Sequence, residues 1–160
     1  MRRLTPVPGI AGAVLLAALG LAGCATASAA SSVAIASAYV PVPQSGTPGT
    51  TVAYLDIRNN GRADRLLAVH TSVGGTVQFR APAGRDADAE IMRTVAYIPI
   101  PADSMVQLNP DHDYLLITGA GPMHDGKDIT LQLTFANAGT ITVLAVVTNP
   151  QNGGSSYFLN

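Results

Sequence analysis

The chain has 160 residues, of which 48% are hydrophobic and only 12% are charged, and its formal net charge is −1. This composition shows no basic patch, so we expect no binding of nucleic acid. Cys24 is the only cysteine, which excludes a framework of internal disulfides.

The first 23 residues are typical of a bacterial lipoprotein signal peptide. Arg2 and Arg3 provide a positive start, and Gly9–Ala22 is an apolar run that is too short for a stable transmembrane span. The run ends in the letters LAGC, where small residues precede Cys24. In such signals a diacylglycerol is attached to the cysteine thiol and the chain is cut just before it. We therefore expect lipidation of Cys24 and a mature chain of residues 24–160.

A lipid on Cys24 has consequences for chemistry and for location. The thiol is then unavailable for a disulfide, a metal site or a nucleophile. The lipid would hold the protein on the extracytoplasmic face of the cell membrane, and residues 24–32, which are small and polar, would form a flexible tether. The alternative is an ordinary secretory peptide cleaved near residues 27–29, which would leave a free protein.

The mature sequence predicts short strands separated by turns. A weakly alternating strand at residues 32–40 is followed by a loop rich in proline and glycine and by Thr51–Arg58, which is rich in β-branched and aromatic residues. Because Asn-Gly tolerates the positive φ of a tight turn, residues 59–61 predict a hairpin in which Leu66–Val69 returns as the second strand. Alternation along the first of these strands places on one face Ala53, Leu55 and Ile57.

The rest of the chain continues this pattern, with a proline-containing connector, IPIP, in which Pro99 must lie at a sheet edge. No stretch has a period of 3.6 residues over twelve positions. The pattern therefore predicts an all-β sandwich of eight or nine strands that forms a single domain over residues 33–148, followed by a disordered tail over residues 149–160. The later strands are expected at residues 74–80, 90–96, 105–108, 114–118, 129–136 and 140–147.

Several segments, in this order, resemble the periplasmic copper chaperones of the PCu(A)C type. They are LDIRNNG, DRLLAV, IPIPA and GKDITLQLTFANAGTITV, and the resemblance covers about residues 33–147. It implies a cupredoxin-like Greek-key β-sandwich that binds Cu(I) through histidine and methionine and passes it to cuproproteins such as cytochrome oxidase. Thioether and imidazole ligands suit Cu(I) because it is a soft cation.

The ligand spacing of that family fits this chain without a gap, but the ligands do not. Registered on Met92, the motif places its first histidine at Arg80, an adjacent methionine at Ala81, its second histidine at Tyr114 and its last methionine at Leu116. Arg80 carries a permanent positive charge and has no lone pair to donate. The family's copper site therefore cannot be carried over, and only Met92 survives from it.

Other soft donors suggest a relocated Cu(I) site. The candidate ligands are Met92, His112, Met123 and His124, because His112 lies two residues before the second histidine position and the last two follow in the next loop. In the alternative interpretation the two histidines are solvated loop residues and Met92 fills the core. His70 is expected to be a strand residue and Met105 a core residue.

Neither the acidic residues nor any catalytic motif in the sequence indicates an enzyme. Asp86, Asp88 and Glu90 alternate along one segment, and Asp111 and Asp113 lie close together, but neither group supplies the six to eight oxygens of a Ca²⁺ site, so we expect solvated faces. The sequence carries no nucleophile-elbow, zincin, P-loop or dinucleotide motif.

The sequence as a whole predicts a membrane-anchored extracytoplasmic lipoprotein that handles copper as the resemblance implies. The alternative is an envelope lipoprotein that has kept the sandwich as a protein-interaction module and has lost the metal. A third possibility is that a partner protein supplies the missing ligands, in which case its contact would lie near Arg80 and Tyr114.

Overall fold

The structure is a computed structural model, and it describes residues 32–44, 46–83 and 91–152. The signal peptide, Cys24 and nearly all of the expected tether lie outside these residues, as do Asp86, Asp88 and Glu90 and the end of the expected tail. The start of that tail forms a short 3₁₀ helix, Pro150–Asn152. In the part of the chain that is described, no helix is long and apolar enough to cross a membrane.

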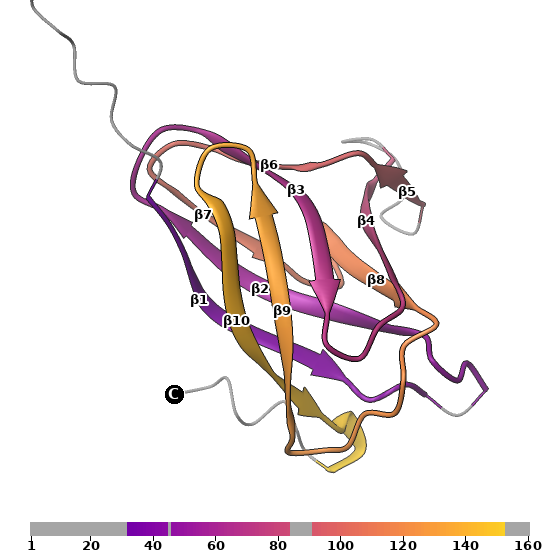
Figure 1. Cartoon of the computed structure of the whole chain (residues 1–160). Coiled ribbons are helices and arrows are strands. Elements are labelled where there is room, and N and C mark those ends of the chain that lie inside the picture. The colour runs from indigo at the N-terminus through magenta and orange to yellow at the C-terminus, as the bar shows by residue number, and fades with distance from the viewer. Residues whose placement is uncertain (1–31, 45, 84–90, 153–160) are drawn as a thin grey trace, which may run out of the picture.

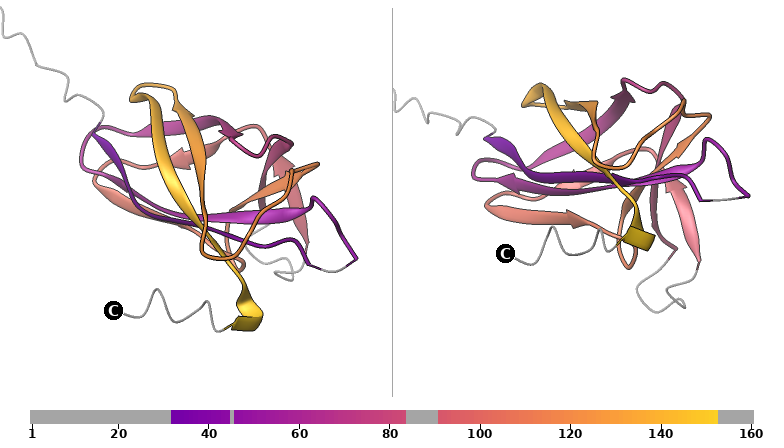
Figure 2. Two further views of the ribbon diagram at one scale, coloured as in Figure 1. Left: turned by 60° about the horizontal axis from the view of Figure 1, so that its bottom comes forward. Right: turned by 90° about the horizontal axis from the view of Figure 1, so that it is seen from below.

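Ten strands make up the described structure. They are β1 (Val33–Pro41), β2 (Thr51–Asn59), β3 (Asp64–Thr71), β4 (Thr76–Pro82), β5 (Met92–Val95), β6 (Ile98–Ile100), β7 (Ser104–Leu108), β8 (Tyr114–Thr118), β9 (Asp128–Phe135) and β10 (Gly139–Thr148). Their order is β5-β4-β8-β2-β1-β10-β9-β3-β6, and β7 pairs with β2 beside β8. The parallel pair β1–β10 joins two layers, so that β10, β9 and β3 lie in front of β1, β2 and β8 (Figures 1 and 2).

The core lies between the two layers and follows the alternation of the strands. The expected inner face of β2 is confirmed, because its three apolar residues are at most 1% exposed. The opposite layer contributes every second residue of β9, and β8 adds Leu115 and Ile117, both fully buried. Burial of aliphatic side chains at about 25 cal/mol per Å² is the main favourable term in such a sandwich. The all-β sandwich and the single domain predicted from the sequence are thus confirmed.

The predicted hairpin between β2 and β3 is wrong. β2 pairs with β1, β7 and β8, whereas β3 pairs with β9 and β6, so residues 60–63 carry the chain from one layer to the other. Asn59, which is fully buried, determines this path. Its Nδ2 donates to the carbonyl oxygens of Arg62 at 2.8 Å and Pro101 at 2.9 Å, and its Oδ1 accepts from the Gly61 N–H at 3.0 Å. The asparagine side chain makes an Asx turn, and Gly61 does not adopt the positive φ that a tight hairpin requires.

A second buried polar residue, Asp64, fixes the start of β3. One carboxylate oxygen accepts from the Asn137 N–H at 2.9 Å and the other from the Ala138 N–H at 2.8 Å. These bonds tie β3 to the turn between β9 and β10. A buried carboxylate is tolerated here because backbone donors satisfy both of its oxygens.

Two further expectations, the connector around Pro99 and the burial of Met105, need correction. The connector around Pro99 is itself a strand, β6, which pairs with β3 and raises the number of strands to ten. The edge position expected for Pro99 is confirmed, since β6 ends the strand order. Met105, expected in the core, is 46% exposed, because β7 pairs with β2 in a register that sets Met105 opposite the exposed Arg58.

Replacement of the buried asparagine tests this account of the layer crossing. We expect Asn59→Ala to lower the free energy of unfolding by about 2–3 kcal/mol, because it removes the buried side chain that donates to the Arg62 and Pro101 carbonyl groups and accepts from the Gly61 N–H. Urea denaturation of residues 25–160 measures the change. Asn60→Ala is the matched control: Asn60 is exposed and its backbone bond to Ser32 is kept, so the loss should stay within about 0.5 kcal/mol. Equal effects of the two substitutions would contradict the assignment.

Candidate functional site

The positions that the copper-chaperone resemblance singles out come together on the outer face of β4 and β8. The alternation that buries Phe79 on β4 and Leu115 on β8 turns Arg80, Tyr114 and Leu116 away from the core. In the antiparallel register of these strands Arg80 lies directly opposite Tyr114. The spacing predicted from the sequence therefore corresponds to real neighbours in the fold.

Met92 lies on the same outer face, one strand further along. β5 pairs with β4 so that Thr94 is opposite Arg80 and Met92 is opposite Pro82. Val95, which is opposite the buried Phe79, marks the inner face of this short strand. Alternation then places Met92 and Thr94 on the face of Arg80.

Arg80 itself holds β4 to β5 through its guanidinium group. Nη1 donates to Thr94 Oγ1 and Nη2 donates to the Met92 carbonyl oxygen, both at 2.8 Å. Nε is buried, and no acceptor within the described ranges reaches it. A fixed positive charge thus lies at the position of the first family histidine, where it repels a metal cation.

His112 lies at the same end of β8 as Tyr114, in the turn that precedes the strand. The ring is exposed, and its Nδ1 is 3.0 Å from Asn109 Oδ1. An amide oxygen only accepts, so Nδ1 is the donor and a neutral imidazole keeps its lone pair on Nε2. Metal-binding histidines commonly donate their second ring N–H in this way.

Met123 and His124 lie beyond the other end of β8. The strand is five residues long, which corresponds to about 13 Å between its first and last Cα atoms. Met123 packs against the core, and the exposed His124 accepts from the Lys127 N–H through its carbonyl oxygen at 3.1 Å. The structure therefore brings Met92 and His112 to one end of β8 and places the other two candidate ligands past the opposite end. Among the described residues, no group of three or more His, Cys, Asp and Glu side chains could hold a metal ion.

The other histidine and the remaining acidic pair take no part in this arrangement. His70 is an exposed residue of β3, in agreement with the expected strand position. Asp111 is exposed and its backbone N–H donates to Asn109 Oδ1 at 3.0 Å. Asp113 is half-buried, and this burial raises the pKa of its carboxyl group, an effect that His112 partly opposes.

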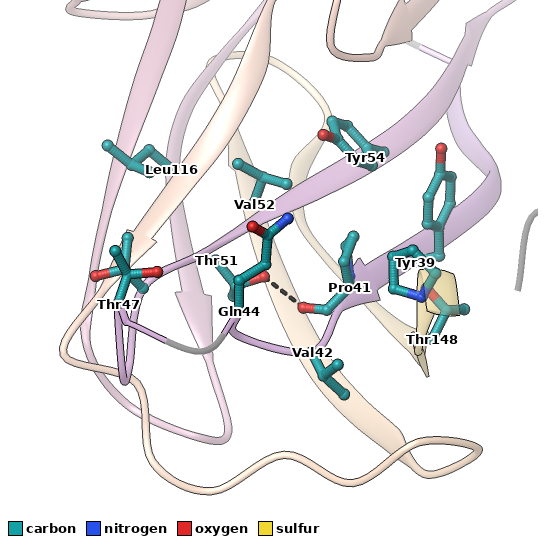
Figure 3. A pocket seen from close by; sticks show the side chains of 12 residues that line it. Tyr39, Pro41, Val42, Gln44, Thr47, Thr51, Val52, Tyr54, Leu116 and Thr148 are labelled. Atoms are coloured by element: carbon teal, nitrogen blue, oxygen red, sulfur yellow. Dashed lines mark hydrogen bonds between the residues drawn. The ribbon is translucent and has the colours of Figure 1, made fainter. Parts of the chain in front are cut away.

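A pocket next to these residues was not foreseen from the sequence. It has a volume of about 490 Å³ and lies over the outer face of β1, β2 and β8 (Figure 3). Leu116, which stands at the family's last methionine position, lines the pocket together with Val52 and Tyr54. The alternation of β2 places Val52 and Tyr54 on the face opposite the core, but the loop that encloses the pocket has no periodic pattern in the sequence.

Two tyrosines stand side by side at this pocket. The rings of Tyr39 and Tyr54, which are partners in the β1–β2 register, are 5.1 Å apart between centroids and tilted by 51°. Burial raises the pKa of both hydroxyls, and in Tyr54 the neighbouring Tyr39, Tyr114 and Asp111 add to this effect. Both hydroxyls are therefore neutral donors at physiological pH.

Comparison with known proteins finds one matching family and several similar solved structures. A family model described as "Putative lipoprotein LpqE-like" matches residues 33–147. The copper-bound PCuAC domain from PmoF2 is 23% identical with a TM-score of 0.63, over 74% of this chain and 93% of that domain. The apo PCuAC domain from PmoF1 is 22% identical with the same TM-score, over 74% and 94%.

A solution structure of CuI-DR1885 from Deinococcus radiodurans is also similar. It is 22% identical with a TM-score of 0.60, over 71% of this chain and 76% of that one. No curated protein matches the chain. At these identities the likeness establishes the fold, and the expected sandwich of the copper-chaperone type is confirmed.

The half-buried carboxyl group of Asp113 predicts that the stability of the fold depends on pH. At pH 7 the Asp113 carboxyl is charged in the folded and the unfolded state, and burial penalises the charge only in the folded state. We therefore expect Asp113→Asn to raise the Tm at pH 7. The difference should shrink as the pH falls and should vanish below about pH 4, where both states bind the proton. Thermal melts between pH 3 and pH 8 measure it, with the exposed Asp111→Asn as control; a lower Tm of Asp113→Asn at pH 7 would contradict the prediction.

Proposed function

The chain belongs to the LpqE-like lipoprotein family, and from this premise we propose that it is an extracytoplasmic lipoprotein, anchored to the cell membrane through a lipid on Cys24, that acts there as a copper chaperone-like protein. The PCuAC fold supports a connection with copper, because two of the similar structures are described as copper-bound or CuI forms. The proposed role is one of binding, since the sequence carries no catalytic motif.

The geometry supports action on a copper-containing partner through protein contact better than carriage of Cu(I) at the family's own site. The single observation that carries this is the Arg80 guanidinium, which takes the first histidine position and is bonded to Met92 and Thr94. Tyr114 and Leu116 supply no ligand in its place. We propose that the outer face of β5, β4 and β8 contacts a membrane cuproprotein, of which cytochrome oxidase is the type that the resemblance suggests.

A second candidate function is Cu(I) carriage by relocated ligands. The observation in its favour is the bond from His112 Nδ1 to Asn109, which orients the ring as in many metal sites. Met92 would be the thioether partner at the same end of β8, and Met123 and His124 would have to reach it from the loop that follows the strand.

The position of the proposed face suits a membrane-anchored protein. β1 begins at Val33, nine residues after Cys24, and its first residue pairs with Asn59 at the far end of β2. The family positions lie near the other end of β2, where Ala53 pairs with Leu115. A nine-residue strand is about 25 Å long, so the face is held well away from the anchored end.

A Cu(I) titration distinguishes the two candidates. We expect residues 25–160 not to compete for Cu(I) with a chromophoric chelator under reducing conditions. The variant Arg80→His/Tyr114→His/Leu116→Met, which keeps Met92, should bind one Cu(I), because the register already places all four side chains on one face. Adding Met92→Ala to that variant is the matched control and should weaken the binding.

Tight one-to-one binding by the unaltered chain would contradict the first candidate. If Met92→Ala/His112→Ala then abolishes this binding, the second candidate is supported in its place. An unchanged affinity in the double variant would exclude Met92 and His112 as ligands.

The anchor is tested separately from copper. We expect Cys24→Ala to move the protein from the membrane fraction to the soluble extracytoplasmic fraction, because without the thiol no lipid can be attached. Cell fractionation with immunodetection measures the shift. The serine replacement Ser28→Ala, in the expected tether, should leave the protein on the membrane. Persistent membrane association of Cys24→Ala would contradict the proposed anchor.

A further inference from the structure

The pocket over β1, β2 and β8 is lined by no histidine, methionine or cysteine and has the size of a small-molecule site. Its volume of about 490 Å³ falls within the usual range of ligand pockets, roughly 300–1,000 Å³. The strands supply its floor through Val52, Tyr54 and Tyr39, and the chain segments that follow β1 and β10 supply its walls (Figure 3). The floor is rigid, since the β1–β2 and β2–β8 ladders fix it.

The lining is uncharged. None of the twelve residues around the pocket is acidic, basic or a histidine. An ionised ligand would lose hydration here without gaining a countercharge, which costs several kcal/mol. The lining of the pocket therefore suits a neutral molecule better than an ionised one.

The lining is nevertheless rich in groups that donate and accept hydrogen bonds. Four threonines, one glutamine and two tyrosines face the pocket together with a smaller set of aliphatic side chains. Thr51 donates to the Pro41 carbonyl oxygen and keeps its lone pairs. In the described part of the chain no partner is found for the side-chain hydroxyl of Tyr54 or the amide of Gln44. An acyl chain would bury these groups unsatisfied, at about 1–3 kcal/mol each.

A ligand that is neutral, rich in hydroxyls and also able to pack on aromatic rings meets all these requirements. A sugar ring presents C–H groups on its face and hydroxyls around its edge. The negative face of a tyrosine ring attracts such C–H groups, and the surrounding threonine and amide groups can bond the hydroxyls. We propose that this pocket binds a small neutral saccharide, with Tyr54 and Tyr39 as the stacking platform and Gln44 among the polar contacts.

An NMR titration of residues 25–160 with maltose and, separately, with cellobiose tests the proposal without copper. The described elements of the fold all lie within this part of the chain. We expect amide shift changes that saturate and are confined to residues 39–54, 116 and 148–149. Tyr54→Ala should weaken binding at least about tenfold, because the platform is lost. Tyr54→Phe keeps the ring and the packing, so it should weaken binding only about fivefold, the effect of one neutral hydrogen bond.

Tyr97→Phe is the matched control. Tyr97 lies between β5 and β6, which contribute no residue to the pocket, and its ring is 5.4 Å from the Arg65 guanidinium. Removal of the Tyr97 hydroxyl should therefore leave the affinity unchanged. Shift changes with 1-octanol but with neither disaccharide would overturn the proposal in favour of an aliphatic ligand. Absence of saturable changes with both sugars, or equal weakening by Tyr97→Phe and Tyr54→Phe, would overturn it as well. None of these outcomes depends on whether the chain binds Cu(I).

Discussion

Side-chain alternation along β2 is the constraint on which both the core and the candidate sites depend. The strand pairs with β1 on one side and with β8 and β7 in succession on the other. Its inner residues are buried between the layers, and the same alternation turns Val52 and Tyr54 outward, where they form the floor of the pocket. A shift of one residue in this strand would exchange the two sets. The stability of the sandwich and the geometry of the outer face are therefore fixed by the same register.

The outer face of β5, β4 and β8 brings together the positions at which the family resemblance predicts metal ligands. β4, β8 and β5 keep the register that places Arg80, Tyr114 and Met92 together. Here a cationic side chain links β4 to β5 through two hydrogen bonds to neutral acceptors, each of which is stronger than a neutral–neutral bond. The positive charge of Arg80 is covalently part of the chain and cannot be transferred.

The sequence was sufficient to predict those features that depend on the two-residue alternation of side chains along a strand or on the spacing between residues. Alternation identified the buried residues of β2, and the spacing from Arg80 through Met92 to Tyr114 gave positions that the strand register brings together. It was insufficient where one side chain overrides a local preference. Asn-Gly favours a hairpin, yet Asn59 bonds to Arg62 and Pro101 and carries the chain to the other layer. Pro101 lies forty-two positions away, so no local rule could include it. The pocket was missed for a similar reason, since its walls come from the segments after β1 and β10.

Leu116 connects the two candidate surfaces. It stands at the family's last methionine position and it also lines the neutral pocket. A methionine there would place a polarisable thioether sulfur in the pocket wall, whereas leucine presents only aliphatic carbon. Leu116 thus supplies no Cu(I) ligand at that position and presents an apolar side chain to the pocket. Beside it lies the fixed charge of Arg80, and both features lie toward the end of the domain opposite the proposed lipid anchor. A partner or ligand that approaches this end would meet an uncharged cavity next to one cation, a surface that differs in kind from an exposed copper site.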